Sequence, residues 1–151
     1  MLSSILVAVD GSAHANAAVD FASDLAAKFG AQLVIANIVT RAGSDRVPEE
    51  LLLFEKIEQL RVTERDIIQG AATEIVANAA KRARSRGAAK VVTVTPSGDP
   101  AQTIVALAKK RKVDLIALGR RGLGDLKSLL LGSVSHKVSQ LADCACLTVK
   151  K

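Results

Sequence analysis

Ile5-Leu6-Val7-Ala8-Val9-Asp10-Gly11-Ser12 opens the chain with an apolar run that stops at a turn. Valine and isoleucine favour strands, and Asp-Gly-Ser is a typical turn sequence, so the run predicts a β-strand. Ser12 can cap a following helix, whose apolar residues recur at helical spacing as far as Phe29 before Gly30 ends it. A strand that leads directly into a helix is the repeating unit of α/β folds.

The same alternation of strand and helix continues to the end of the chain. Further strands are predicted at residues 32–38, 90–95, 113–118 and 144–149, with a loop at 40–50. The near-continuous apolar run at 32–38 is typical of a strand buried on both faces of a parallel sheet. We therefore predict an α/β fold: an open five-stranded parallel sheet with helices on both faces, Rossmann-like, formed by residues 1–151 as a single domain.

Apolar residues at helical spacing indicate which helix positions face the sheet. A long helical stretch begins near Leu60 and closes at Gly87, and a shorter one begins with proline at its first position, Pro100, behind the capping residue Asp99. The apolar positions of the predicted helices are Ala18, Ala22, Leu25, Ala26, Phe29, Ile67, Ala71, Ile75, Ala79, Ala83, Ile104, Leu107, Ala108, Val134, Val138 and Leu141.

The composition excludes several classes of protein. No apolar run approaches the roughly 18 residues of a membrane span, and the N-terminus reads as a strand and not as a signal peptide. We therefore expect a cytoplasmic protein with no membrane partner. Cys144 and Cys146 lie two apart with only two histidines in the chain, His14 and His136. Buried, reduced thiols on one face of a strand are the favoured interpretation, and a zinc site is not.

The net charge of +6 comes largely from two basic stretches, at 81–90 and 109–112. Such charge attracts nucleic acid or any other polyanion. Lysine and arginine also complement the dipole at helix C-termini, and the aromatic residues that stack on bases are nearly absent. Solvated helix ends are therefore favoured, and nucleic-acid binding is the less favoured alternative.

Two predicted strands end in residues suited to a ligand. Asp10 follows the first strand, and Gly119-Arg120-Arg121-Gly122 follows the fourth. Ligands of open α/β sheets bind beyond the carboxyl ends of the strands, where the strand order reverses. Glycine lets the backbone approach a ligand, and the helix that Gly132-Ser133 opens offers N–H groups that suit phosphate. Lys127 adds charge, and the hydroxyls of Ser133 and Ser135 add donors. A glycine-rich surface turn before a serine-capped helix is an equally open alternative.

The spacing of these residues matches a family pattern for ATP binding, Gly-x2-Gly-x9-Gly-Ser/Thr. Here the pattern is Gly119, Gly122, Gly132 and Ser133. The segments 5–12, 98–100 and 113–119 are also similar, so that the likeness covers the whole chain. The sequence resembles the ATP-binding subclass of the universal stress protein family. That resemblance implies an adenine nucleotide alpha hydrolase-like sheet and ATP with Mg²⁺ as the ligand.

The resemblance also implies roles for single residues. Asp10 would face the ribose or the metal, and Ile38 would contact the adenine. For Asp10 the alternative is a turn residue that bonds its own backbone, and for Ile38 it is core packing. The last strand would lie at the edge of the sheet and form a homodimer with its copy. The complete set expected to bind the nucleotide is Asp10, Ile38, Gly119, Arg121, Gly122, Gly132, Ser133, Val134 and Ser135.

Two functions compete for this set of residues. A nucleotide-dependent regulatory stress-response protein with little or no turnover is favoured, because no nucleophile–base pair and no Gly-Lys-Ser/Thr motif occurs. The alternative is a slow ATP hydrolase or phosphotransfer enzyme, for which His136 would be the candidate group. A surface histidine is the favoured interpretation of His136. One departure from the family pattern is Cys144-Ala145-Cys146, where the family often has Cys-Pro-Val.

Overall fold

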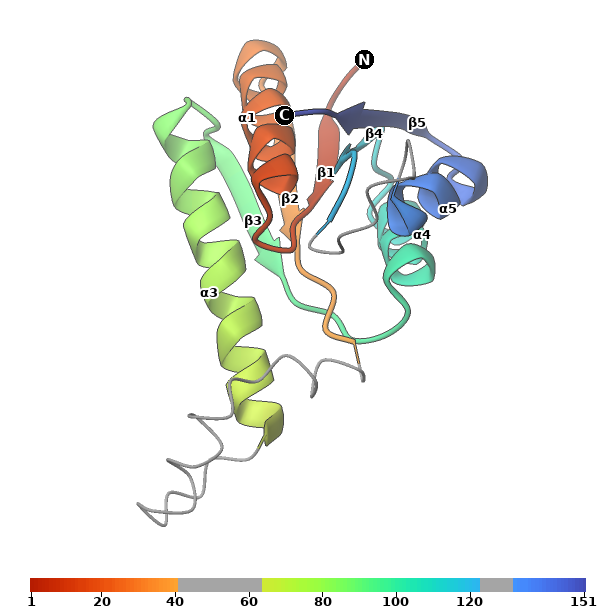
Figure 1. Ribbon diagram of the computed structural model, residues 1–151. Helices are drawn as coiled ribbons and strands as arrows, with labels where there is room; N and C mark the ends of the chain where they lie inside the picture. Colours follow the sequence, from red (N-terminus) through yellow and green to blue (C-terminus); the bar gives the residue numbers. More distant parts are fainter. Residues whose placement is uncertain (41–63, 123–131) are drawn as a thin grey trace.

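The computed structural model describes residues 1–40, 64–122 and 132–151. Strands and helices alternate along these residues, as the sequence predicts (Figure 1). In chain order they are β1 (Ser4–Ala8), α1 (Ala13–Phe29), β2 (Gln32–Ala36), α3 (Glu64–Ser85), β3 (Lys90–Val94), α4 (Pro100–Lys110), β4 (Leu115–Gly119), α5 (Ser133–Leu141) and β5 (Ala145–Val149). The predicted loop at 40–50, except for Thr40, lies outside the described residues, and so does the start of the long helical stretch at Leu60.

The strands form a parallel sheet in the order β3-β2-β1-β4-β5. The predicted five-stranded α/β fold is therefore confirmed. β1 lies in the centre, with β2 on one side and β4 on the other, and Ile5 pairs with both Leu33 and Leu115. β5 lies at one edge, as the family resemblance implied. Each strand begins and ends within two residues of its predicted bounds.

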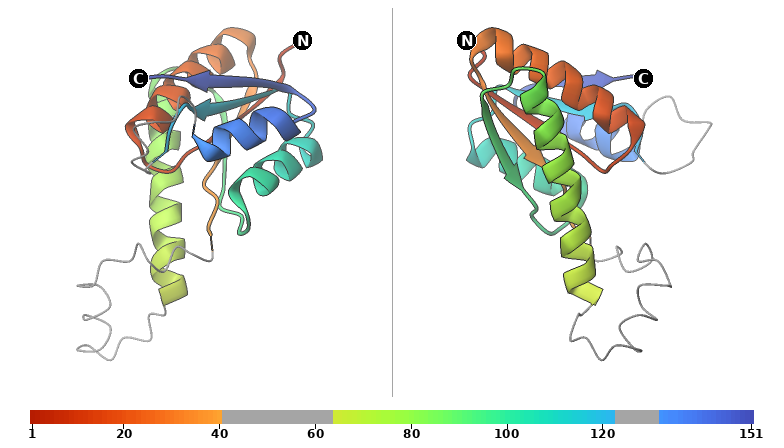
Figure 2. Two further views of the ribbon diagram at one scale, coloured as in Figure 1. Left: turned by 45° about the vertical axis from the view of Figure 1, so that its right-hand side comes forward. Right: turned by 90° about the vertical axis from the view of Figure 1, so that its left-hand side faces the viewer.

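Helices cover both faces of the sheet. α1 and α3 lie side by side on one face, and α4 and α5 lie on the other (Figures 1 and 2). Because successive side chains of a strand point to opposite faces, each buried strand packs against both helix layers. The structure thereby confirms the expectation that residues 32–38 are apolar because their strand is covered on both sides.

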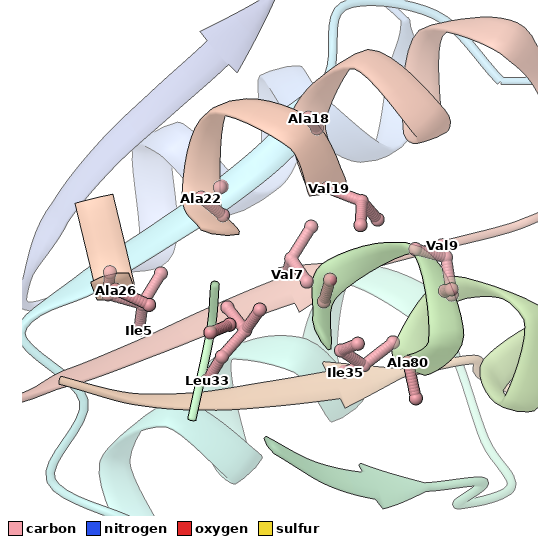
Figure 3. Packing of buried hydrophobic residues seen from close by; sticks show 14 of the residues in the cluster. Ile5, Val7, Val9, Ala18, Val19, Ala22, Ala26, Leu33, Ile35 and Ala80 are labelled. Atoms are coloured by element: carbon pink, nitrogen blue, oxygen red, sulfur yellow. The ribbon is translucent and has the colours of Figure 1, made fainter. Parts of the chain in front are cut away.

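The core side chains follow this alternation. On the α1 face, Ile5 and Val7 of β1 and Leu33 of β2 are fully buried against alanines of α1, as Figure 3 shows. On the other face, Leu6 packs with Ile104 of α4 and a neighbouring set that includes Val138 of α5. Small alanines on α1 let that helix approach the sheet closely, so that the core needs few large side chains.

Three predicted core positions are wrong. Phe29 and Leu141 are 50% and 54% exposed, and Ala71 is exposed while its neighbour Ala72 is buried. Phe29 and Leu141 are the last residues of α1 and α5. The apolar spacing continues to these helix ends, but the surface against which each helix packs does not extend that far. Ala71 lies off the buried face of α3, which is formed by Ala72, Val76, Ala79, Ala80 and Ala83.

Part of the positive charge has a structural role. Arg82 of α3 donates to both carboxylate oxygens of Asp20 on α1, with Nη2 2.6 Å from Oδ2. One turn further along, Arg86 binds Asp24 in the same way, with Nη2 2.7 Å from Oδ2. The hydrogen bond from Arg82 holds the pKa of Asp20 below its usual value. These exposed pairs link the two helices, and solvent screening keeps their contribution to stability small.

The two cysteines are free and half-buried, so the prediction of reduced thiols agrees with the structure but that of full burial does not. Both pack against the core on the α4 face, as two residues one strand period apart should. Burial raises the pKa of the Cys144 and Cys146 thiols. No helix among the described residues is long and apolar enough to cross a membrane.

Candidate functional site

The two strand ends singled out in the sequence meet in the structure. β1 and β4 are neighbours at the point where the strand order reverses. A Cβ placed on Gly122 would lie 2.6 Å from Asp10 Oδ2, a distance that real Cβ contacts do not reach. The Asp10 carboxylate and the glycine loop (residues 119–122) therefore form one surface at the carboxyl ends of the strands, where open α/β sheets bind ligands.

Asp10 has a structural role as well as a place in this surface. Its Oδ1 accepts a hydrogen bond from the Ser12 backbone N–H at 2.9 Å, and Ser12 Oγ caps α1 by accepting from the Ala15 N–H at 3.1 Å. The alternative of a turn residue is thus observed for Oδ1, while Oδ2 faces Gly122. The hydrogen bond to Oδ1 fixes the orientation of the carboxylate relative to the turn.

Asn37 helps to position Asp10, and the sequence analysis missed it. Its side-chain Nδ2 donates to the carbonyl of Val9, the residue before Asp10, at 2.8 Å. Its backbone N–H donates to Val94 O at 3.1 Å, which ties the ends of β2 and β3 together. The sequence contained one indication of this role, because Asn37 is a single amide side chain at the end of an apolar strand. Buried polar groups are normally hydrogen-bonded, so a partner for this amide could have been expected.

Gly119 is a glycine for a reason other than ligand approach. A Cβ there would lie 2.7 Å from the carbonyl carbon of His14 and 2.8 Å from the backbone nitrogen of Ala15. β4 therefore ends in close contact with the first turn of α1. Gly119, Gly122 and Gly132 all lack a positive φ, so a left-handed backbone is not the reason for glycine at these positions. An added Cβ would meet backbone atoms of α1 at Gly119, the Asp10 carboxylate at Gly122 and, at 3.3 Å, the Arg120 carbonyl oxygen at Gly132.

Arg120 joins the glycine loop to two other elements through its backbone. Its N–H donates to Val149 O of β5 at 2.7 Å, and its carbonyl accepts from the Gly132 N–H at 2.8 Å. The buried Ser135 hydroxyl lies 3.2 Å from the same carbonyl and 3.0 Å from the Gly132 carbonyl. Ser135 has a single hydroxyl proton, and both neighbours are acceptors, so it is already donated inside the protein. Ser135 thus supports the loop in this structure, contrary to the expectation that it offers a free donor.

The first turn of α5 differs from those of α1 and α4. Side chains cap α1 and α4: Ser12 caps the former, and Asp99 Oδ1 accepts from Gln102 N at 3.0 Å in the latter. α5 has Gly132 as its N-cap and no side-chain cap, so its first N–H groups face outward with the positive end of the helix dipole. Ser133, its first residue, is exposed. An anion suits this helix start.

The remaining predicted residues are near this surface with mixed roles. Ile38 follows β2, is half-buried and packs against the α4-face core, so the core-packing interpretation holds for part of its side chain. Val134 packs against the same core. Arg121 is half-buried, and His136 is exposed on α5 as expected of a surface histidine. Lys127 lies outside the described residues, and no group of three or more metal-ligating side chains occurs within them.

Comparison with known proteins gives the family. The model of the universal stress protein family matches residues 1–150. The chain belongs to the universal stress protein family. Among its relatives, universal stress protein YxiE from Bacillus subtilis is 35% identical over 158 aligned residues, which cover 99% of this chain and 100% of YxiE.

Solved universal stress proteins share the fold. UspA from Lactobacillus plantarum superposes with a TM-score of 0.77 at 26% identity, covering 98% of this chain and 97% of that one. A universal stress protein from Archaeoglobus fulgidus, solved in complex with dAMP, has a TM-score of 0.66 at 23% identity, covering 99% of this chain and 100% of the other. At the latter identity the likeness shows the fold alone.

Proposed function

We propose that this universal stress protein binds ATP and acts as a nucleotide-dependent regulator, as a single domain in the cytoplasm. The observation that carries the proposal is the start of α5, capped by Gly132 without a side chain and joined to the glycine loop beside Asp10. This is a cradle for phosphate at the switch point of an open α/β sheet. Membership of the family agrees with it.

The residues present fit a nucleotide in one orientation. The N–H groups of Ser133 and Val134 and the Ser133 hydroxyl would hold phosphate oxygens, with Arg121 adding positive charge. Asp10 would accept from a ribose hydroxyl or take part in holding Mg²⁺, whose other ligands would be phosphates and water. Ile38, at the end of β2, would cover the adenine. Magnesium would neutralise the phosphate charge in the bound nucleotide.

Regulation is favoured over catalysis because the described site holds no nucleophile with a base beside it. Asp10 has one oxygen engaged by Ser12, and His136 is exposed on α5. Slow hydrolysis or phosphotransfer is the second candidate, since the phosphates would lie at the start of the helix that carries His136. A basic nucleic-acid module is less favoured, because Arg82 and Arg86 of one basic stretch are paired with aspartates of α1.

A homodimer through β5 completes the proposal. β5 is the edge strand, and it carries no proline. Val149 O accepts from Arg120, so the backbone groups of Val149 and of Leu147, two residues earlier, point toward β4. The N–H and C=O groups of Cys146 and Thr148 then point to the free edge, because these directions alternate along a strand. An antiparallel copy would pair with these edge groups across a two-fold axis.

Calorimetry with Mg-ATP tests the proposed ligand. Wild-type protein should bind, and Gly132→Val should not, because a Cβ at Gly132 already lies 3.3 Å from Arg120 O and the valine methyl groups would obstruct the helix start. Gly70→Ala is the matched control: Gly70 lies on α3 with no atom within 4 Å of its added Cβ. Circular dichroism confirms that each variant folds.

Two results would contradict this proposal at different levels. Wild-type protein that binds no ATP, and carries no nucleotide when mass spectrometry is applied to the native purified chain, would refute ATP as the ligand. Normal binding by folded Gly132→Val would leave the ligand intact and refute the site.

A further inference from the structure

One flank of α1 faces the edge strand β5, which it also contacts (Figure 2). The backbone N–H of Lys151, just after β5, donates to His14 Nδ1 at 3.3 Å, so the side of α1 that carries His14 lies next to β5. Phe21 follows His14 by seven residues, which is about two helical turns, and therefore lies on the same side of α1. α3 packs on the other flank, where Ala27 lies close to Gly87.

Phe21 lies on the same face of the sheet as Leu147 and at about the same level. Seven residues of helix carry α1 about 10 Å back from His14 toward the beginning of the strands. Three residues of strand cover the same distance along β5. The Leu147 side chain points to the α1 face, because Val149 packs against the core on that face and side chains alternate along a strand. Phe21 is 50% exposed and Leu147 is half-buried, so both keep apolar surface beside the free edge of β5.

The free edge of β5 indicates what covers this apolar surface. The outward N–H and C=O groups of Cys146 and Thr148 require a strand as their partner, and a second copy of β5 supplies one. A two-fold axis that joins two such strands antiparallel stands perpendicular to the sheet, so the α1 faces of both copies lie on the same side. The apolar surfaces of the two copies then meet across the axis.

Charges at the two ends of β5 indicate the register of this pairing. With Leu147 on the axis, Asp143 of one copy lies opposite Lys151 of the partner subunit at each end of the paired strands. Moving the axis by one residue in either direction removes this pairing of opposite charges. The Asp143 side chain is 81% exposed, and its contact with Lys109 is at 4.0 Å, so it is accessible to a second cation.

We propose that Leu147 lies on the two-fold axis of the dimer and that Phe21 of each copy is buried in the same interface. This inference rests on the proposed dimer through β5, to which it adds the register and a part of α1. The backbone groups of Leu147 face β4, so the two copies of Leu147 form a non-hydrogen-bonded pair. Side chains approach each other most closely in pairs of this kind.

Disulfide cross-linking tests the register. Leu147→Cys in a Cys144→Ser/Cys146→Ser background should form a covalent dimer on mild oxidation with diamide, read by non-reducing electrophoresis. The Cα atoms of such a pair lie about 4.5 Å apart, within the range of a disulfide. Ala145→Cys in the same background is the matched control, because residue 145 lies opposite Val149 of the partner subunit, and its two copies are about 13 Å apart. Wild type should not cross-link either, because Cys146 lies opposite Thr148 of the partner subunit.

Sedimentation equilibrium of two phenylalanine variants tests the contribution of α1. Phe21→Ser should raise the dissociation constant of the dimer by about tenfold or more, because the exposed halves of two aromatic rings lose their apolar cover. Phe29→Ser is the matched control and should dimerise as wild type does. Phe29 is equally exposed, but it precedes β2, which lies on the far side of β1 from β5. Circular dichroism confirms that each variant folds.

The outcomes separate this inference from the proposed function. Wild type that sediments as a monomer would refute the dimer and this inference together. A dimer in which Leu147→Cys does not cross-link, or in which wild type or Ala145→Cys does, would refute the register and leave the dimer intact. An unchanged dissociation constant for folded Phe21→Ser would show that α1 takes no part in the interface. Failure of ATP binding would leave these tests intact, because neither Leu147 nor Phe21 belongs to the proposed nucleotide contacts.

Discussion

Replacing Gly119 with alanine should destabilise the protein more than any other small change in the glycine loop. The new Cβ would meet three backbone atoms of α1 at 2.7–2.9 Å: the His14 carbonyl carbon and oxygen and the Ala15 nitrogen. Ordinary contacts begin near 3.4 Å, so α1 or β4 must shift by more than half an ångström. Overpacking in a dense interior costs about 1–3 kcal/mol, and a backbone contact that cannot rotate away belongs at the upper end.

Urea unfolding followed by far-ultraviolet circular dichroism measures this effect. The chain has no tryptophan and no tyrosine, so intrinsic fluorescence is a poor probe. A loss near 3 kcal/mol should lower the melting temperature by about 6–12 °C in a chain of this size. Protein concentration is held fixed, because self-association would shift the apparent stability.

Gly70→Ala gives a control of opposite sign. Gly70 lies inside α3 and has open space around its missing side chain. Alanine there should raise the free energy of unfolding by about 0.8–1 kcal/mol, the difference in helix propensity. A free energy of unfolding for Gly119→Ala within about 0.5 kcal/mol of wild type, the usual range of neutral surface changes, would refute the close packing of β4 against α1.

Four further predictions concern assembly, pH, turnover and nucleic acid. Thr148→Pro removes a backbone N–H from the free edge of β5 and should give a monomer in sedimentation equilibrium. Leu147→Pro removes a backbone N–H that faces β4 and should chiefly lower the stability of the fold. Wild-type protein that stays monomeric at tens of micromolar (an association free energy of about −6 kcal/mol) contradicts the dimer. Because Arg82 lowers the pKa of Asp20, the pair stabilises the protein above the usual pKa of 3.8, and the benefit is lost as the pH falls through the folded pKa; Asp20→Asn should thus cost at most about 1 kcal/mol at pH 7, with the difference in unfolding free energy vanishing in acid. Steady-state ATP hydrolysis should be far below a typical enzyme rate of about 10 per second, and a rate near that value restores the enzyme hypothesis. DNA or RNA binding should be weak and steeply dependent on salt, and sequence-selective submicromolar binding at physiological salt contradicts it.

The sequence predicted the layers of this fold well, because local patterns determine them. Alternation of strands and helices, the capping residues Ser12 and Asp99 and the terminating Gly30 all act within a few residues of themselves. The errors at Phe29 and Leu141 arose where a helix continues beyond its contact with the sheet. Periodicity reports which face of a helix is apolar, but it does not report how far along the helix the neighbouring surface extends.

The candidate site was predicted less completely, because long-range contacts determine its details. The sequence predicted that Asp10 and the glycine loop lie together at the carboxyl ends of the strands, and the structure places Gly122 against Asp10. It gave no sign that Gly119 packs on α1 or that the Ser135 hydroxyl is engaged by Arg120 and Gly132. The contact of Gly119 with α1 and that of Ser135 with Arg120 each join segments more than a dozen residues apart, which spacing along the chain does not reveal.

The central position of β1 has a consequence for synthesis on the ribosome. β1 leaves the ribosome before the other strands of the sheet, and β2 follows soon afterwards as its partner on one edge. The other edge of β1 pairs with β4, where Ile5 lies opposite Leu115. Until β4 emerges, the nascent protein carries an apolar strand, buried in the finished fold, that has one edge without a partner strand. Such edges are where growing chains associate wrongly, so chains released before β4 is made should depend on chaperones far more than the finished protein does.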